Sequence, residues 1–578
     1  MSAINLAEII TGGKNPAKVA YYCNTQQVSY RDLFNRAASL AQGMRAIGVA
    51  KRQRVLICLY DTPAISEAFL AALSIGAIPV VVNPRFSRAS FEHVLHDSAA
   101  RLVLGENDNL ALLDALCQLA PHNPVLMLQD SYGTPGLQIA DKLDATHLHL
   151  SDFVKALDVP FAFERIGELD AAFWQYTSGT TGKPKAVQHA SRTMLANTDA
   201  FARQTHGLGE HDIFYSAAKM FFGYGFGASF FFPLLLGASA VLDPFMPSND
   251  FTVLRHIGLY RPSVFFGAPA IYAALLNHVE RIKPCLPGQF TCISAGSSLP
   301  QAIFDKWQAA FGLNIYDGIG ATEMGHIFIA NRAGQVKSGA TGIPIAGYDV
   351  ALLTREEGQL RPGSGDGGIL CVRGPHPDLG YWNRPQATQE KFIADPFGND
   401  ATVGGQQNRN QAGNHDAENP VENQAGSRDI TPISISLEYT DCNQGWYVTG
   451  DLFSRDADGF YTYRGREDDL FKSNGIWVEP LAIENALLLQ VPNLLECALV
   501  PKSDEQELVY PVLYCVFNPN TPSRRESILA VKAALATICD KHSLPREILL
   551  LDALPRNDNG KISRMALAAL EMDGSKTA

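Results

Sequence analysis

One ten-residue stretch concentrates the residue types that bind phosphate groups. Residues 176–185 read Tyr-Thr-Ser-Gly-Thr-Thr-Gly-Lys-Pro-Lys, with two glycines, two lysines and four Ser/Thr hydroxyls. Glycine lets backbone N–H groups approach oxygen atoms, hydroxyls donate hydrogen bonds and lysine offsets negative charge. The stretch is not the usual P-loop, because Lys183 is followed by Pro184 and the glycine spacing is shorter. It predicts a loop that wraps an oligophosphate, against the alternative of a solvated Ser/Thr/Gly loop.

Three further segments carry residues that suit the same chemistry. Asp317-Gly-Ile-Gly-Ala-Thr-Glu323 ends in a carboxylate that suits a hard cation such as Mg²⁺. Asp451, in residues 447–451, is able to accept hydrogen bonds from the two hydroxyls of a ribose. Lys561, near the C-terminus, is a cation that would lower the cost of bringing two anions together. Taken singly, each residue also reads as an ordinary surface charge.

The order of these segments resembles the motif series of the adenylate-forming superfamily, which includes acyl-CoA synthetases, luciferases and peptide-synthetase adenylation domains. The resemblance covers essentially the whole chain except residues 399–440. It implies that Mg·ATP activates a carboxylate as an acyl-AMP, which a thiol then attacks. Two departures stand out: Ala186 replaces the usual glycine after Lys185, and residues 557–559 are Asn-Asp-Asn where small or hydroxyl residues are common.

The resemblance assigns roles residue by residue. The catalytic residues would be Thr177, Lys185, Glu323 and Lys561, and Glu323 would also hold the metal ion. Nucleotide contacts would come from Ser178, Gly179, Thr180, Thr181, Gly182, Lys183, Ser297, Asp317, Gly318, Thr322, Asp451, Arg466 and Lys472. Asp468 would be the hinge between two domains, and Ser473 and Gly475 would border the path of CoA.

Two segments bear on which carboxylic acid the enzyme would activate. Residues 216–225 and 317–326 follow the pattern of benzoate-type CoA ligases, and together with residues 556–561 they resemble most the bacterial anthranilate–CoA ligase branch of alkylquinolone biosynthesis. Aromatic side chains suit a flat ring. The predicted substrate residues are Phe222, Gly223, Tyr224, Gly320, Gly325 and His326. His326 would bond the substrate carboxylate or an ortho amino group, and Gly325 would leave room for a ring substituent; Phe221 reads as a core residue. Benzoate and hydroxybenzoates stay open as substrates.

The implied enzyme is an AMP-forming acid–thiol ligase that uses ATP, Mg²⁺ and coenzyme A on an aromatic carboxylic acid. One alternative is a stand-alone adenylating enzyme that loads a carrier protein, which shares the first half-reaction. Another is a regulatory protein on an inactive fold, against which the retention of Thr177, Glu323 and Lys561 argues. The sequence leaves the oligomeric state open, a homodimer included.

Composition narrows the class of protein. The chain has 578 residues, a net charge of −12 and ten cysteines. This charge argues against general nucleic-acid binding, and the absence of any CxxC pair predicts reduced thiols. No signal peptide is evident at the N-terminus, so we expect a cytoplasmic protein. The uncharged stretch 220–242 has four glycines, which favours a buried turn, helix and strand over a membrane span.

The elements that position these motifs follow an α/β pattern. Residues 54–60 and 78–82 read as strands and residues 64–75 as the helix between them, which predicts a parallel sheet. Further strands are expected at 101–105, 263–266 and 292–296. We predict a large multi-subdomain N-terminal domain with parallel sheets (1–466), which contains a polar, disordered insertion (399–440). A small mobile α+β C-terminal domain (467–578) would follow, with strands near 498–500 and 512–517 and a helix at 528–541.

Overall fold

The structure is a computed structural model that describes residues 3–129, 148–153, 160–177, 183–245, 249–356, 358–363, 366–375, 378–397, 445–473, 476–504, 508–518, 523–556 and 562–570. Some predictions fall outside these residues. They concern Ser178, Gly179, Thr180, Thr181, Gly182, Gly475, Lys561 and the insertion 399–440.

The first sheet of the described residues has seven strands in the order β11-β10-β5-β4-β6-β7-β8. Its strands are β4 (Arg54–Cys58), β5 (Ile78–Val81), β6 (Leu102–Glu106), β7 (Val125–Gln129), β8 (Leu148–His149), β10 (Ala171–Thr177) and β11 (Lys185–Ala190). The predicted strand–helix–strand unit is confirmed, because β4 and β5 pair in parallel and α3 (Pro63–Ser74) connects them. Every residue of α3 is buried, which explains its apolar sequence.

A second sheet has nine described strands in the order β18-β17-β16-β15-β14-β12-β13-β2-β3. These are β2 (Val19–Cys23), β3 (Gln26–Ser29), β12 (Ile213–Ser216), β13 (Ser239–Leu242), β14 (Val264–Gly267), β15 (Thr291–Ser294), β16 (Ile315–Gly320), β17 (Ile327–Ala330) and β18 (Ile343–Pro344). Strands β2 and β12 to β16 pair in parallel, so their carboxyl ends lie along one edge. In open α/β sheets this edge is where ligands bind.

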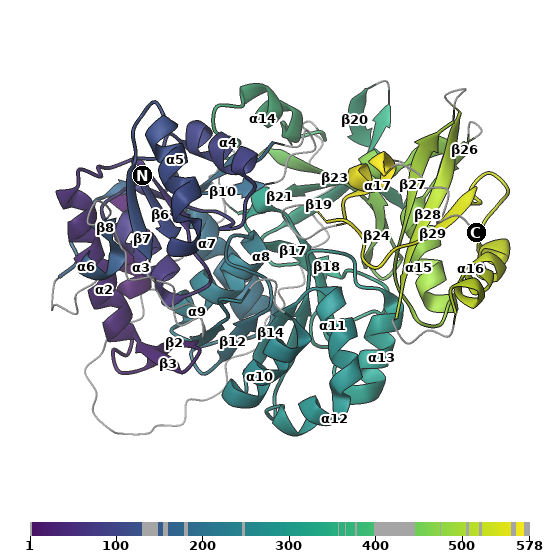
Figure 1. Cartoon of the computed structure of the whole chain (residues 1–578), viewed down its shortest axis with the longest axis horizontal. Coiled ribbons are helices and arrows are strands. Elements are labelled where there is room, and N and C mark those ends of the chain that lie inside the picture. The colour runs from purple at the N-terminus through teal and green to yellow at the C-terminus, as the bar shows by residue number, and fades with distance from the viewer. Residues whose placement is uncertain are drawn as a thin grey trace.

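Helices cover the two sheets on the large unit (Figure 1). They are α1 (Leu6–Thr11), α2 (Tyr30–Ala46), α4 (Arg88–Ser98), α5 (Leu110–Leu119), α6 (Leu150–Phe153), α7 (Ser191–Asn197), α10 (Asp250–Tyr260), α11 (Pro269–Leu275), α12 (Val279–Ile282), α13 (Gln301–Phe311) and α14 (Pro385–Lys391). A short pair, β1 (Ala3–Ile4) with β9 (Ile166–Gly167), ties the N-terminal segment to the body.

The apolar stretch 220–242 folds as predicted. A turn leads into α8 (Gly223–Phe226), a π-helical segment η3 (Gly227–Phe231) and α9 (Phe232–Leu236), and β13 follows. Gly237 ends α9 with φ of 73°, a conformation that glycine adopts readily. Among the described residues, no helix is both long and apolar enough to cross a membrane.

A third sheet follows and contains β19 (Asp349–Glu356), β20 (Gln359–Pro362), β21 (Gly367–Arg373), β22 (Phe392–Ile393), β23 (Trp446–Arg455) and β24 (Tyr461–Arg466). The chain then enters a smaller α+β unit. This C-terminal unit has the hairpin β25 (Phe471–Ser473) and β26 (Ile476–Val478), a sheet of β27 (Leu494–Ser503), β28 (Val509–Phe517) and β29 (Glu547–Leu550), and helices α15 (Pro480–Gln490), α16 (Arg524–Ile538) and α17 (Arg564–Ala569).

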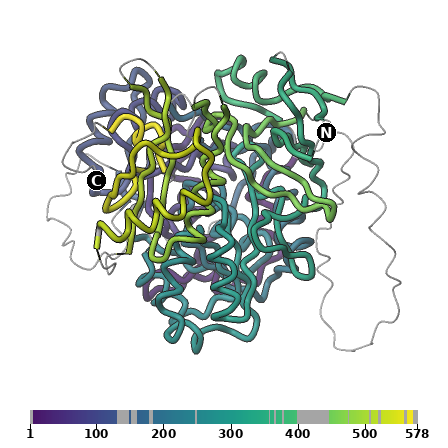
Figure 2. Tube along the Cα trace, turned by 90° about the vertical axis from the view of Figure 1, so that its right-hand side faces the viewer, coloured from purple at the N-terminus to yellow at the C-terminus, as the bar shows by residue number. Residues whose placement is uncertain are grey.

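The C-terminal unit has hydrophobic clusters of its own, built from residues between Phe471 and Leu567. It lies against one side of the large unit (Figures 1 and 2), and α15 contacts α13 and β24 there. The predicted α/β class, with parallel sheets in a large unit and a small α+β unit at the C-terminus, is confirmed. The exact boundary between residues 466 and 467 and the mobility of the small unit remain predictions.

Candidate active site

The described ends of the predicted phosphate loop lie side by side. Thr177 is the last residue of β10, Lys185 is the first of β11, and the two are paired across the antiparallel ladder. On its other side β10 pairs in parallel with β5, so Thr177 comes at the carboxyl end of a parallel strand. Lys183 is exposed beside Pro184. The fold therefore brings Thr177 and Lys185 together at a ligand-binding edge.

Glu323 lies in a cluster with Lys185 and two tyrosines. The Tyr381 hydroxyl donates a 2.5 Å hydrogen bond to Glu323 Oε1, and Tyr447 is hydrogen-bonded to the same carboxylate. Lys185 Nζ lies 5.4 Å from the centre of the Tyr381 ring. Burial and the Glu323 charge raise the pKa of both tyrosines, which keeps them protonated as donors. The sequence prediction assigned no role to Tyr381, because a Gly-Tyr-Trp turn carries no chemical signal by itself.

The donor set around Glu323 fits a magnesium ion held mainly by a nucleotide. In the part of the chain that the structure describes, no group of three or more His, Cys, Asp or Glu side chains is arranged to hold a metal ion. Mg²⁺ is commonly bound by one or two carboxylates together with substrate phosphates. A single carboxylate beside Lys185 is consistent with that mode and not with an all-protein metal cage.

Asp451 and Arg466 form a cross-strand pair beside this cluster. The Arg466 guanidinium donates to Asp451 Oδ1 over 3.0 Å, and the two residues are paired between β23 and β24. Gly450 has φ of 77°, and a Cβ there would lie 3.1 Å from the Arg466 guanidinium. Asp451, the predicted ribose-binding residue, and Arg466, a predicted nucleotide contact, are thus brought together, and Tyr447 lies with Asp451 on β23.

Four other predicted nucleotide residues lie within β16 or in the segments that follow β15 and β16. Ser297 is exposed and follows Gly296, whose φ is 91°. Thr322 begins the turn that carries Glu323, and Gly318 is buried in β16. Asp317 is only 4% exposed, and burial raises the pKa of its carboxyl well above the usual range. Its side chain therefore faces the protein interior, and its nucleotide contact stays a prediction.

Aromatic residues form a wall at the start of α8. Phe222 precedes the helix, half-buried, and its ring centre is 4.3 Å from that of Phe221, which is buried in the core as predicted. The Tyr224 hydroxyl donates to the carbonyl oxygen of Ile293, 3.0 Å away, at the end of β15. The Tyr224 hydroxyl is thus used by the fold, and the ring is what Tyr224 offers to a ligand.

His326 is a neutral residue in an aromatic surrounding. It is 3% exposed, packs against Phe201 and Phe232, and burial lowers its pKa to about 3. Its Nε2 lies 3.3 Å from the carbonyl oxygen of Tyr224, which assigns the proton to Nε2. Nδ1 is buried without a protein partner. Of the two predicted contacts of His326, this arrangement favours a donor such as an amino group over a carboxylate.

The glycines of the predicted substrate set allow close packing between segments. A Cβ at Gly325, where φ is 78°, would lie 2.7 Å from Thr193 and 2.8 Å from Asn197 on α7. The space expected there for a ring substituent is therefore filled by α7, and Gly325 is explained by packing. A Cβ at Gly320 would lie 2.5 Å from the His326 carbonyl oxygen, and one at Gly223 would lie 3.4 Å from Gln175. Buried Gln175 on β10 is a neighbour of this site that sequence reasoning missed.

The predicted hinge lies between residues that are tied to different units. Asp468 is the middle residue of the 3₁₀ turn Glu467–Asp469. Glu467 accepts a 2.8 Å bond from Arg355 on β19 of the large unit. Asp469 lies 3.3 Å from Arg564 on α17 of the C-terminal unit. Asp468 thus lies between a residue bound to the large unit and a residue bound to the C-terminal unit, and its role as a hinge stays a prediction.

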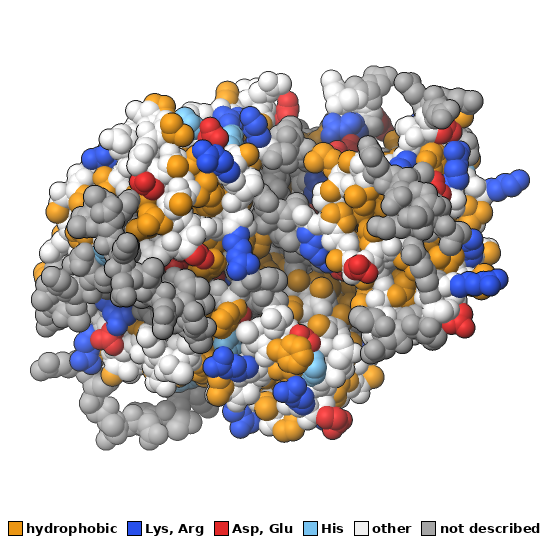
Figure 3. All heavy atoms as spheres, in the orientation of Figure 1, with side chains coloured by type: hydrophobic (Ala, Val, Ile, Leu, Met, Phe, Trp, Pro, Cys, Tyr) orange, Lys and Arg blue, Asp and Glu red, His pale blue; other side chains and the backbone are white. Residues whose placement is uncertain are grey.

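The remaining predicted residues belong to the β25–β26 hairpin. Lys472 is exposed and its Nζ lies 4.8 Å from the Trp477 ring centre, whereas Ser473 is only 2% exposed in this arrangement. Lys472 also borders a hollow of about 570 Å³ together with Lys502 and Ser503. All residues that line this hollow belong to the C-terminal unit. Figure 3 shows, besides, that the surface is indented between the C-terminal unit and the large unit. The nucleotide role of Lys472 and the CoA role of Ser473 remain predictions.

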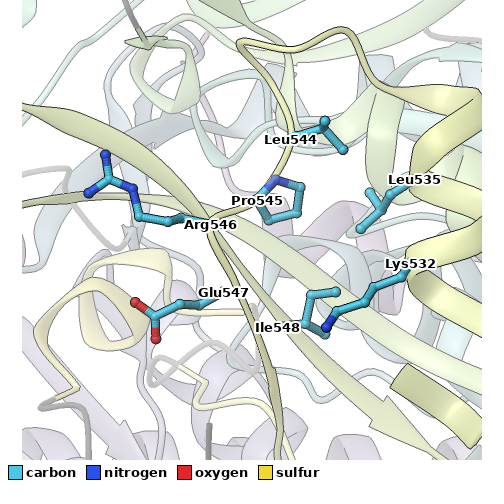
Figure 4. Close-up of a pocket in the computed structure, with 7 residues that line it drawn as sticks. All are labelled: Lys532, Leu535, Leu544, Pro545, Arg546, Glu547 and Ile548. Atoms are coloured by element: carbon cyan, nitrogen blue, oxygen red, sulfur yellow. The ribbon is translucent and has the colours of Figure 1, made fainter. Parts of the chain in front are cut away.

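A second cavity of about 140 Å³ lies within the C-terminal unit (Figure 4). Lys532 and Leu535 of α16 face the segment from Leu544 to Ile548 across it. None of the predicted site residues lines this cavity, so it is separate from the candidate active site.

Comparison with known families gives two matches along the chain. Residues 11–382 match the model of the AMP-binding enzyme family, and residues 482–561 match the model of the AMP-binding enzyme C-terminal domain. The first match covers more than half of the 578 residues. All the predicted site residues from Thr177 to His326 fall within it.

Two relatives and one solved structure extend these matches. The chain is 38% identical to an anthranilate–CoA ligase of Pseudomonas aeruginosa over 521 residues, which is 89% of this chain and 87% of the relative. It is 30% identical to a benzoate–CoA ligase of Thauera aromatica, with 95% of this chain and 92% of the relative covered. The fold is similar to the crystal structure of an anthranilate CoA ligase in complex with anthranoyl-AMP, with a TM-score of 0.80, 26% identity, and 98% and 96% of the two chains covered.

Proposed function

The chain belongs to the AMP-binding enzyme family, and on this premise we propose that it is an ATP-dependent aryl-CoA ligase whose favoured acid is anthranilate. The reaction is AMP-forming acid–thiol ligation, with ATP and coenzyme A as co-substrates of an aromatic carboxylic acid. The observation that carries the proposal is the convergence of Lys185, Tyr381 and Glu323 beside the Asp451–Arg466 pair. An anionic nucleotide needs cations at its phosphates and a carboxylate at its ribose, and the positions of Lys185 and Asp451 support this proposal.

In the first half-reaction an oxygen of the acid attacks the α-phosphorus of ATP, an aryl-AMP forms and pyrophosphate leaves. Thr177 and Lys185, at the adjoining ends of β10 and β11, are proposed to bind the phosphates. Glu323 is proposed to orient Mg²⁺, which when bound would offset negative charge on those phosphates. The hydrogen bonds from Tyr381 and Tyr447 hold the Glu323 carboxylate in place. Lys561, outside the described residues, is proposed to bring the two anions together.

In the second half-reaction the thiol sulfur of CoA attacks the acyl carbon of the aryl-AMP. A carbon–sulfur bond forms, the carbon–oxygen bond to AMP breaks and the thiol proton is released. We propose that the C-terminal unit rotates about Asp468 between the two steps, so that Ser473 and Gly475 approach the site. Glu467 is bonded to the large unit and Asp469 to the C-terminal unit, which supports a pivot at Asp468.

The aromatic surroundings of His326 support anthranilate as the favoured acid. The ring of the acid would lie against Phe222 and Tyr224. An ortho amino group donates hydrogen bonds, and neutral His326 is able to accept one of them at Nδ1. A benzoate or hydroxybenzoate CoA ligase is the alternative, and loading of a carrier protein would share the first half-reaction. A cytoplasmic location and a homodimer also remain predictions.

The first test measures AMP release by the purified protein with Mg·ATP, with and without CoA. The acids are anthranilate, benzoate, salicylate, 4-hydroxybenzoate and octanoate. We expect release that depends on both acid and CoA, with the highest kcat/KM for anthranilate. A preference for benzoate or 4-hydroxybenzoate would overturn the choice of acid, and pyrophosphate release without CoA-dependent turnover would support carrier loading. A preference for octanoate would contradict the aryl-acid proposal.

A further inference from the structure

One face of helix α4 contacts β10, which leads into the predicted phosphate-binding segment, and Pro184, which directly precedes β11. The helix is capped by Ser87 and packs on the sheet through buried Phe91, Val94 and Leu95. His93 and Asp97 are four residues apart, so their side chains lie on the same face one turn from each other. Neither residue belongs to the motifs that indicated the function.

Asp97 makes the larger set of contacts. Its Oδ2 accepts a 2.9 Å hydrogen bond from the hydroxyl of Tyr176, the residue before Thr177 on β10. Its Oδ1 accepts a 2.8 Å bond from the Arg384 guanidinium, and its backbone carbonyl accepts a bond from the Trp382 indole. The Asp97 side chain is only 7% exposed, so these charge-assisted bonds are shielded from water.

The residues that bond to Asp97 are next in sequence to Thr177 and close in sequence to Tyr381, two residues of the candidate active site. Tyr176 directly precedes Thr177, the last residue of β10. Trp382 and Arg384 follow Tyr381, which donates to Glu323. Trp382 also donates its backbone N–H to the carbonyl oxygen of Ala186 on β11. One carboxylate thus ties together the strand that carries Thr177 and the turn that carries Tyr381.

His93 contacts the residue that directly precedes the other strand, β11. Its Nε2 lies 2.8 Å from the carbonyl oxygen of Pro184, the residue directly before Lys185, and donates its proton there. The two side chains therefore anchor the chain on both sides of residues 178–182, at Tyr176 and at Pro184. Figure 1 shows α4 close to α14, which begins directly after Arg384.

We propose that Asp97 and His93 are positioning residues for ATP: from α4 they set the separation and orientation of Thr177 and Lys185, and Asp97 also sets the turn that holds Glu323. The proposal rests on the proposed function for the identity of the nucleotide. It extends the site to a helix that carries none of the predicted site residues. Because they act through other residues, their loss should weaken nucleotide binding more than binding of the aryl acid.

The test measures the dissociation constant of the Mg²⁺ complex of α,β-methylene-ATP by calorimetry, without acid or CoA, and KM for ATP and for anthranilate in the full reaction. Loss of a charge-assisted bond predicts that Asp97→Asn raises the dissociation constant about tenfold, with Tyr176→Phe similar. KM for anthranilate should change less than about twofold. His93→Ala should raise KM for ATP, and His93→Gln, which keeps a donor, should restore much of the loss.

Matched controls use the same helix. Glu92→Gln and His96→Ala change exposed side chains next to the anchors and should leave both KM values unchanged. Asp97→Asn combined with Tyr176→Phe should cost less than the sum of the single effects, because both remove one bond. If Asp97→Asn does not fold, Tyr176→Phe and His93→Ala carry the test.

Unchanged analogue affinity in folded anchor variants would overturn the proposal, and so would parallel losses for ATP and anthranilate. Binding of the analogue does not require an aryl acid. A wild-type protein that binds the analogue but turns over no aryl acid would therefore contradict the proposed function without deciding the role of α4.

Discussion

At the scale of single residues, His326 is a neutral imidazole with an unpaired Nδ1 among aromatic rings. We expect His326→Leu to lower the ratio of kcat/KM for anthranilate over benzoate about fivefold, the effect of one neutral hydrogen bond. Because its pKa is lowered to about 3, the wild-type ratio should not change between pH 5 and 8 through protonation of this residue. His206→Leu, which removes another buried imidazole with a pKa of about 3, is the control. Equal losses for the two acids would show that His326 only supports the fold.

Glu323 is the second residue whose surroundings define a test. Its carboxylate is held by Tyr381 and Tyr447, and charge, not shape, is what a Mg²⁺ site requires. Glu323→Gln should lower kcat of ATP–pyrophosphate exchange about a hundredfold and raise the Mg²⁺ concentration needed for half activity. Tyr381→Phe, which keeps the charge and removes one bond, should have a smaller effect of about tenfold. An unchanged magnesium dependence in Glu323→Gln would contradict the metal role.

At the scale of elements, the sequence predicted the strands and helices that show a periodic apolar pattern. It did not predict contacts between residues far apart in the chain. The strands near Val55 and Val80 and the helix between them were predicted because an apolar run beside helical periodicity is a local signal. The order of the motifs predicted nucleotide contacts for Asp451 and Arg466 but not the cross-strand pairing between them. Tyr381 and Asp97 were missed because their roles arise only when α4, β10 and the turn after Gly380 come together.

The Glu467–Asp469 turn is the element on which two half-reactions in one site would depend. Asp468→Pro should hold φ of this residue near its value in a 3₁₀ turn. We expect one half-reaction to fall at least about tenfold while the other stays nearly unchanged, since each would need its own orientation of the C-terminal unit. Pyrophosphate exchange and thioester formation from supplied aryl-AMP measure the two steps separately. Asp468→Ala keeps rotational freedom and is the control; parallel losses in Asp468→Pro would contradict a hinge.

At the scale of the whole molecule, the large unit buries several carboxyl groups that the predicted chemistry does not use. Asp61 and Glu67 are almost fully buried, and desolvation raises the pKa of each to about 7. Glu106 has its pKa raised to about 8, mainly by burial, although it accepts a hydrogen bond from the Tyr60 backbone N–H. Composition gave no sign of these groups, because an acidic residue in a sequence reads as exposed until the fold covers it.

Because of these buried carboxyl groups, we expect the folded protein to lose stability as the pH rises. In the folded protein the raised pKa keeps the proton on Glu106 up to a pH of about 8, whereas in the unfolded chain Glu106 loses its proton near pH 4.5. The folded state therefore binds more protons, and the contribution to stability is full below about pH 4.5 and is lost as the pH rises to about 8. The midpoint temperature of thermal unfolding should therefore decrease as the pH is raised from 6 to 9.

Glu106→Gln isolates this effect, because the amide keeps the shape and cannot ionise. Its unfolding midpoint should fall less steeply with pH than that of the wild type, and at pH 8.5 it should be the more stable protein by about 1–2 kcal/mol. Glu8→Gln, on a half-buried residue of α1 whose carboxylate pairs with Arg165, should leave the pH dependence between pH 6 and 9 unchanged. If wild type and Glu106→Gln lose stability in parallel between pH 6 and 9, then Glu106 is ionised in the folded protein, and the bond from the Tyr60 N–H outweighs the cost of burying its charge.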